Sequence, residues 1–135
     1  RWNRWLQKSG LWDYFFDARR FQIDLYTFTE QYELAISEAN KMKQKALDID
    51  NNRGTVAAYQ CLSNAYIGSQ RWDEGLKALE EAYRLLPKNG NAVVHISVLS
   101  QLISVTKEMK DNYRQLKYLQ ELENVLRKFI MTIHL

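Results

Sequence analysis

Residues 59–87 read YQCLSNAYIGSQRWDEGLKALEEAYRLLP, and small residues alternate with large ones at regular spacings along this stretch. The small residues are Ser63, Ala65, Gly75, Ala78 and Ala82. Such a pattern could position catalytic groups. It could equally let two helices lie close together, because small side chains allow the backbones to approach. The rest of the sequence decides between these two interpretations.

The composition predicts one helical domain. A chain of 135 residues that is 46% hydrophobic buries roughly two-thirds of its unfolded surface when it folds. It contains five glycines and one proline, while good helix formers such as Leu, Ala, Glu and Lys are plentiful. No run of about 18 apolar residues occurs, so we expect no membrane contact by this segment itself. The single cysteine, Cys61, excludes an internal disulfide.

Charged residues are mixed in sign along the whole chain. The formal net charge is +3, and basic residues are interleaved with acidic ones in stretches such as KMKQKALDID at 41–50. Mixed charges of this kind are typical of solvated helix faces and not of a nucleic-acid surface. We therefore expect no nucleic acid among the partners.

Apolar residues recur at steps of three and four, as in Leu76, Leu79, Ala82 and Leu86. Breaks rich in Gly, Asn, Asp and Pro separate these periodic segments. The pattern predicts six helices, at about 11–28, 31–49, 54–68, 72–86, 91–109 and 112–131. Because the connections are short, neighbouring helices are expected to run antiparallel, as helical hairpins.

The hairpins repeat. When LYTFTEQYELA (25–35) is set beside AYIGSQRWDEG (65–75), Tyr26 aligns with Tyr66 and Ala35 with Gly75, at an offset of 40 residues. A weaker third copy aligns Tyr113 with Trp72 at an offset of 41 and predicts about one extra helical turn before Tyr113. A fixed period of this length predicts a solenoid of stacked hairpins. The expected boundaries are 1–10 for the end of a preceding repeat helix, 11–50, 51–89 and 90–131 for three repeats, and 132–135 for a tail.

The second repeat resembles the tetratricopeptide repeat (TPR), whose pattern is W-x2-L-G-x2-Y, then A-x3-F, then a small residue and a closing proline. The positions that carry the resemblance are Tyr59, Leu62, Ser63, Tyr66, Gly75, Leu79, Ala82 and Pro87. The first repeat keeps Tyr26, Ala35 and Ala39 but has Leu47 in place of the proline. The resemblance implies an all-α fold, a TPR-like α-solenoid of about three antiparallel hairpins that is a fragment of a longer array.

More narrowly, NNRGTVAAYQCLSNAY at 51–66 is similar to the TPR sensor segments of Bacteroides-type signalling proteins and histidine kinases. This resemblance implies the sensory or interaction part of a larger bacterial signal-transduction protein. Any kinase domain would lie outside this segment. The compartment stays open, with a periplasmic sensor segment of a membrane protein slightly favoured over a cytoplasmic one.

No catalytic or metal-binding motif occurs in the sequence. The residues that could act chemically are His95, His134 and Cys61. Cys61 is expected to pack in the interior and His95 to pack or to face solvent, and no carboxylate pair has a partner residue that would give it a catalytic task. We therefore expect no enzyme activity, no metal and no cofactor.

Aromatic residues crowd the first 26 positions and leave two interpretations open. They are Trp2, Trp5, Trp12, Tyr14, Phe15, Phe16, Phe21 and Tyr26. They could pack the contact with a preceding repeat, since the end of a truncated solenoid exposes such a contact. Alternatively they could form an aromatic pocket near Trp12 that senses a small molecule.

The TPR resemblance implies that a partner protein or peptide binds the concave face formed by the first helix of each repeat. The partner-facing positions would be Asp17, Arg20, Asp24, Thr27, Gln60, Asn64, Ile67, Ser97 and Gln101. Cys61, Val94 and Val98 stand at places where carboxylate-clamping family members need Lys, Asn or Arg, so no such clamp is expected. The leading hypothesis is a non-catalytic protein- or peptide-binding scaffold. The alternative is a self-association module that holds a sensor dimer.

Overall fold

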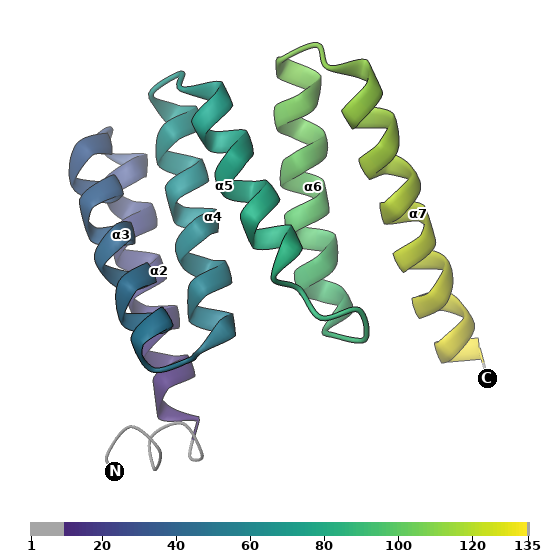
Figure 1. Ribbon diagram of the computed structural model, residues 1–135, viewed down its shortest axis with the longest axis horizontal. Helices are drawn as coiled ribbons and strands as arrows, with labels where there is room; N and C mark the ends of the chain where they lie inside the picture. Colours follow the sequence, from purple (N-terminus) through teal and green to yellow (C-terminus); the bar gives the residue numbers. More distant parts are fainter. Residues whose placement is uncertain (1–9, 135) are drawn as a thin grey trace.

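The computed structural model describes residues 10–134 and shows an all-helical chain (Figure 1). The helices are α2 (Leu11–Phe28), α3 (Tyr32–Asp48), α4 (Asn52–Gly68), α5 (Trp72–Arg84), α6 (Ala92–Glu108) and α7 (Asn112–His134). Within residues 10–134 there is no strand. The all-α class is therefore confirmed. The helix expected before Gly10, together with Trp2 and Trp5, lies outside the described residues.

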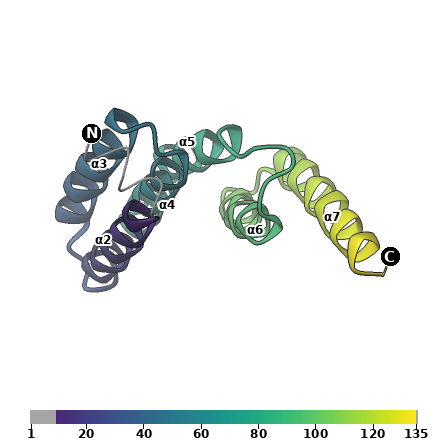
Figure 2. The same ribbon diagram turned by 90° about the horizontal axis from the view of Figure 1, so that it is seen from below.

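Consecutive helices run antiparallel and form three hairpins side by side (Figure 1). Seen from below, α2 and α4 lie next to each other, and α5 spans the space from α4 toward α6 (Figure 2). Helix α4 packs against α2, α3 and α5, while α6 packs against α5 and α7. The result is an extended, helical repeat-like architecture in which each helix contacts its neighbours along the chain.

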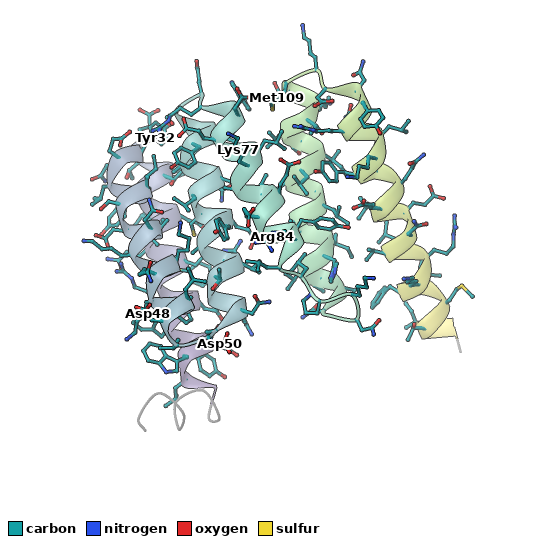
Figure 3. All side chains as sticks on the ribbon, in the orientation of Figure 1. Tyr32, Asp48, Asp50, Lys77, Arg84 and Met109 are labelled. Carbon is teal, nitrogen blue, oxygen red and sulfur yellow. The ribbon has the colours of Figure 1, made fainter. Side chains whose placement is uncertain are left out.

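Four of the turns share one backbone geometry. Glu30, Asp50, Gln70 and Lys110 have φ values of 65°, 55°, 64° and 58°, which is the left-handed region. The residue after each of them donates its N–H to a carbonyl in the last turn of the helix, as Arg71 N does to Tyr66 O at 2.7 Å. This satisfies a carbonyl that the helix end leaves without a partner. Asp50 lies at the opposite end of the hairpins from Tyr32 and Met109 (Figure 3).

The third hairpin repeats at 40 residues, so the predicted offset of 41 was wrong. Helices α3, α5 and α7 begin at Tyr32, Trp72 and Asn112, which are 40 residues apart. The left-handed residues Glu30, Gln70 and Lys110 keep the same spacing. The predicted extra turn before Tyr113 is also absent, because α4 and α6 each contain 17 residues. Tyr113 is 83% exposed and does not replace Trp72 structurally.

The connection between α5 and α6 differs from the other four. It is longer, runs from the end of α5 at Arg84 to Ala92, and includes Pro87. Asn91 caps α6, since its Oδ1 accepts the N–H of Val93 at 2.8 Å. Asn51 caps α4 in the same way, accepting the N–H of Gly54 at 2.8 Å. The long α5–α6 loop borders an open space beside α4, where the candidate site is found.

The core consists of two clusters of buried side chains that meet at Tyr59. One cluster joins α2, α3 and α4 and includes Phe16 and Ile23. The other joins α5, α6 and α7 to α4 and includes Leu79 and Leu102. Tyr59 packs against both clusters. The apolar interior is thus continuous from the first described hairpin to the last.

The small residues of 59–87 lie at helix contacts. A β-carbon built on Gly75 would be 2.7 Å from Cγ1 of Ile67 and 3.4 Å from the carbonyl oxygen of Ser63. Among the other positions of the repeat pattern, six are buried: Ala35, Ala39, Leu62, Ser63, Leu79 and Ala82. Tyr26, Tyr59 and Tyr66 are half-buried, and Pro87 is exposed in the α5–α6 loop. Helices α4 and α5 therefore meet through small residues.

Among the described residues, no helix combines the length and the apolar character that crossing a membrane would require.

Candidate functional site in the groove between α4 and α6

Two clefts lie between α4 and α6, one toward each end of these helices. The first has a volume of about 540 Å³ and is bounded by α2, the start of α4, the α5–α6 loop and the start of α6. Its walls include Val56, Pro87 and Val94, with Arg20 and His95 among the polar groups. The second has a volume of about 360 Å³ and lies between the later turns of α4 and α6 and the start of α5.

A chain of side-chain hydrogen bonds crosses from α4 to α6 between the two clefts. Nε2 of Gln60 donates to Oε1 of Gln101 at 2.8 Å and lies 3.3 Å from Oγ of Ser97. Nε2 of Gln101 in turn donates to Oδ1 of Asn64 at 3.1 Å. We call these four residues the polar bridge. Gln60 and Gln101 line one cleft each, so the bridge divides a single groove into two parts.

The prediction that Gln60 faces a partner on an open surface is wrong, because the structure buries this residue. Its side chain is only 2% exposed, and its amide is used within the polar bridge. The physical reason is that α6 approaches α4 through polar side chains at this level, and a buried amide needs hydrogen-bond partners. Gln60 therefore holds the two helices in place, while Ser97 remains exposed and Asn64 and Gln101 are half-buried.

The charged residues of α2 are paired with one another, with α3 or with α4, and Arg19 pairs with Glu38 of α3. Nη2 of Arg53 lies 3.1 Å from Oδ2 of Asp17, and Nε of Arg20 lies 3.8 Å from Oδ2 of Asp24. Arg53, which also contacts Asp13 at 3.7 Å, was not among the predicted partner-facing residues. Because these charges are mutually neutralised, the first cleft has no strong field of one sign.

Thr27 completes the predicted set on α2. Its Oγ1 is buried and has no hydrogen-bond partner among the described residues. Thr27 lines neither of the two clefts. The structure therefore gathers Asp17, Arg20 and Gln60 at the first cleft and Asn64, Ile67 and Gln101 at the second, with Ser97 between them and Asp24 and Thr27 outside.

The second cleft contains the residues that sequence reasoning missed. Trp72, Val105 and Glu108 join the predicted Asn64, Ile67 and Gln101 in its lining. In the sequence, Trp72 is distinguished only by its alignment with Tyr113 in the weak third copy of the repeat. On α6 the TPR resemblance implied only Ser97 and Gln101 as partner-facing positions. In the first cleft Val93 was likewise missed, although it is 69% exposed.

Of the groups that could act chemically, the structure describes the side chains of Cys61 and His95. Cys61 is fully buried, and burial together with neighbouring Asp24 raises the pKa of its thiol to about 12. Nδ1 of His95 lies 3.1 Å from the backbone oxygen of Asn91, the residue that caps α6. Among the described residues, no group of three or more His, Cys, Asp or Glu side chains is placed to hold a metal ion. The side chain of His134 lies outside the described part.

Trp12 packs against the core. Its ring stacks with Phe16 at a centroid distance of 5.9 Å and meets the edge of Phe15 at 5.1 Å. The ammonium of Lys45 lies 4.9 Å from the centre of the Trp12 ring. Trp12 lines neither cleft of the groove. The aromatic cluster therefore joins α2 to α3 and α4, with Phe16 lying against the backbone of Gly54.

Comparisons of the chain with protein-family models, with curated proteins and with solved structures found no match.

Proposed function

We propose that this chain is a non-catalytic, TPR-like scaffold that binds an extended segment of a partner protein in the groove between α4 and α6. The observation that carries the proposal is the pair of clefts on either side of the polar bridge. Concave, largely apolar sites with a few polar groups are the usual form of a binding site.

The two clefts offer apolar contacts at both ends of the groove. Ile67, Trp72 and Val105 line the second cleft, and Val56, Val93 and Val94 line the first. Eleven positions of α4 separate Val56 from Ile67, which is roughly 16 Å along a helix axis. An extended chain advances about 3.3 Å per residue. A partner segment would therefore place apolar side chains about five residues apart, one in each cleft.

The polar bridge offers hydrogen bonds to the backbone of such a segment. The Nδ2 group of Asn64 and the hydroxyl proton of Ser97 have no acceptor among the described residues. Asn64 lines the second cleft, and Ser97 is exposed on α6 next to Gln60. An extended backbone presents carbonyl oxygens that these donors can bind, so the bridge would fix the position of the segment between its two apolar anchors.

The role in signalling rests on the sequence resemblance of residues 51–66 alone. In this proposal the groove is the interaction part of a larger bacterial signal-transduction protein. A parent reading frame that encodes no signalling output domain would contradict this part of the proposal and leave peptide binding unaffected.

The test uses a random peptide library displayed on phage and selected on the whole 135-residue chain. Enriched peptides are synthesised with a fluorophore, and their affinity is measured by fluorescence polarisation. The blocking variant is Ser97→Trp, because Ser97 is exposed on α6 between the clefts. The matched control is Ser37→Trp, the same change at an exposed serine of α3.

We expect Ser97→Trp to weaken peptide binding by about tenfold or more, since it fills the space between the two anchors. Ser37→Trp should leave the affinity within about twofold. Thermal unfolding of both variants checks that each is folded. If no peptide is enriched, or if both substitutions weaken binding equally, the groove is not the binding site.

A further inference from the structure

Helix α7 carries an exposed apolar stripe that the groove does not use. Its members are Leu116, Leu119, Leu126, Ile130 and Ile133, which are 38% to 66% exposed. Their spacings of three, seven, four and three residues leave one gap, which Glu123 fills. Together the six positions alternate in steps of three and four residues. These are the a and d positions of a heptad repeat, which form the contact between two helices in a coiled coil. We call these six residues the α7 stripe.

The α7 stripe is not needed to hold α7 in place. The side of α7 that faces the core contains Tyr118, which is 4% exposed, with Leu122 and Val125 packed beside it. The hydroxyl of Tyr118 donates to Oε2 of Glu80 on α5 at 2.9 Å, and its ring meets the edge of Tyr83. The stripe lies on an adjoining face, where a depression of about 400 Å³ is lined by α7 residues that include Leu122 at the border with the core.

We propose that the α7 stripe pairs antiparallel with the α7 stripe of a second copy of this chain. The argument for a second copy is that the charges on and beside the stripe are self-complementary. Glu123 of the stripe and the neighbouring Arg127 lie on either side of its middle, form an ion pair within the helix at 2.6 Å, and are both more than 60% exposed, so each can also reach a second copy. A two-fold axis near residue 125 places Glu123 of each copy beside Arg127 of the other.

The charge pattern also selects the orientation. In a parallel pair, the two Glu123 carboxylates would face each other in an apolar seam, which is unfavourable because like charges repel and lose solvation. In the antiparallel pair, Glu123 faces Leu126 of the second copy, next to its Arg127. The remaining layers are Leu116 with Ile133 and Leu119 with Ile130, each an apolar pair. In the antiparallel arrangement, therefore, every one of the six positions faces an apolar residue or lies beside a residue of opposite charge.

The first test measures the mass of the whole chain by sedimentation equilibrium over a range of concentrations. We expect a monomer–dimer equilibrium for the natural sequence. Leu126→Glu should raise the dimer dissociation constant more than about a hundredfold, because it places two further carboxylates in the seam. The matched control is Phe21→Glu on α2, which changes an apolar residue that is 74% exposed at the other end of the array.

Phe21→Glu should leave the dissociation constant unchanged. If it dissociates the dimer, the copies stack end to end through α2, and the proposal is overturned. A natural chain that stays monomeric at all concentrations overturns it as well. Circular dichroism of each variant separates loss of the dimer from loss of the fold. The peptide affinity of the groove is not involved in any of these outcomes, so the two proposals fail independently.

The second test determines the orientation by disulfide cross-linking under mild oxidation. Leu119→Cys alone should give little cross-linked product, because antiparallel pairing keeps the two introduced cysteines roughly 16 Å apart along the helix. A mixture of Leu119→Cys and Ile130→Cys should give a heterodimeric disulfide. The natural chain is the control, since its Cys61 is buried. A strong Leu119→Cys homodimer would show parallel pairing and contradict the proposal.

Discussion

Gly75 lies where α5 packs against α4, and any β-carbon at this position would be 2.7 Å from Cγ1 of Ile67. Ser63, whose carbonyl is the nearest backbone atom, is itself fully buried. The close approach of the two helices therefore depends on the absence of a side chain at one residue and on a small one at the other. The size of these residues determines the contact, since the buried Oγ of Ser63 has no hydrogen-bond partner among the described residues.

Gly75→Leu should lower the free energy of unfolding by about 1–3 kcal/mol through overpacking. The direction of the change distinguishes a tight contact from an open one. Leucine is a better helix former than glycine by about 0.6–0.8 kcal/mol, so Gly75→Leu would stabilise α5 if the space were open. Urea unfolding followed by circular dichroism measures the change. Lys77→Leu, at an exposed position of the same helix, is the control and should be nearly neutral. A Gly75→Leu protein as stable as this control would mean that the contact is not tight.

At the scale of helices and turns, left-handed residues set the register of the hairpins. Glu30, Gln70 and Lys110 adopt this conformation although none is glycine. The conformation costs an ordinary residue roughly 1 kcal/mol, and the turn compensates with hydrogen bonds such as Arg71 N to Tyr66 O at 2.7 Å. The alignment of aromatic residues placed the third hairpin one residue too far along because it ignored this turn.

Gln70→Gly should raise the free energy of unfolding by up to about 1 kcal/mol, because glycine adopts positive φ without a steric cost. The gain is partly offset by the greater freedom of glycine in the unfolded chain. Gln44→Gly is the matched control, since Gln44 is exposed within α3 and the same change there should cost about 1 kcal/mol. Thermal or urea unfolding compares the two variants. Equal destabilisation in both would contradict the assigned turn geometry.

At the scale of the whole molecule, two core clusters share Tyr59, and the polar bridge joins α4 to α6 across the groove. In a repeat architecture each unit is stabilised mainly by its neighbours. The bridge is therefore expected to couple the second and third hairpins and to keep the groove at a fixed width.

A double-mutant cycle measures this coupling. Gln60→Ala and Gln101→Ala should have an interaction energy of about 0.5–1.5 kcal/mol in urea unfolding, because each substitution removes the same hydrogen bond. The control cycle pairs Gln60→Ala with Gln44→Ala on α3, and here the effects should add within about 0.5 kcal/mol. If the free-energy changes of Gln60→Ala and Gln101→Ala are also additive, the bridge does not hold α6 to α4.

The sequence by itself determined the helical class, the positions of the helices to within a few residues, and the 40-residue period of the first two hairpins. It could do so because apolar periodicity and turn residues are local properties of the chain. Only the tertiary structure decided that Gln60 is buried, that Trp72 and Val105 line a cleft, and that the α7 stripe is exposed among residues 10–133. The burial of Gln60 and the lining of the cleft depend on how close α6 lies to α4 and α5, and the exposure of the stripe depends on which side of α7 packs against the core. Both are set by contacts between residues far apart in the sequence.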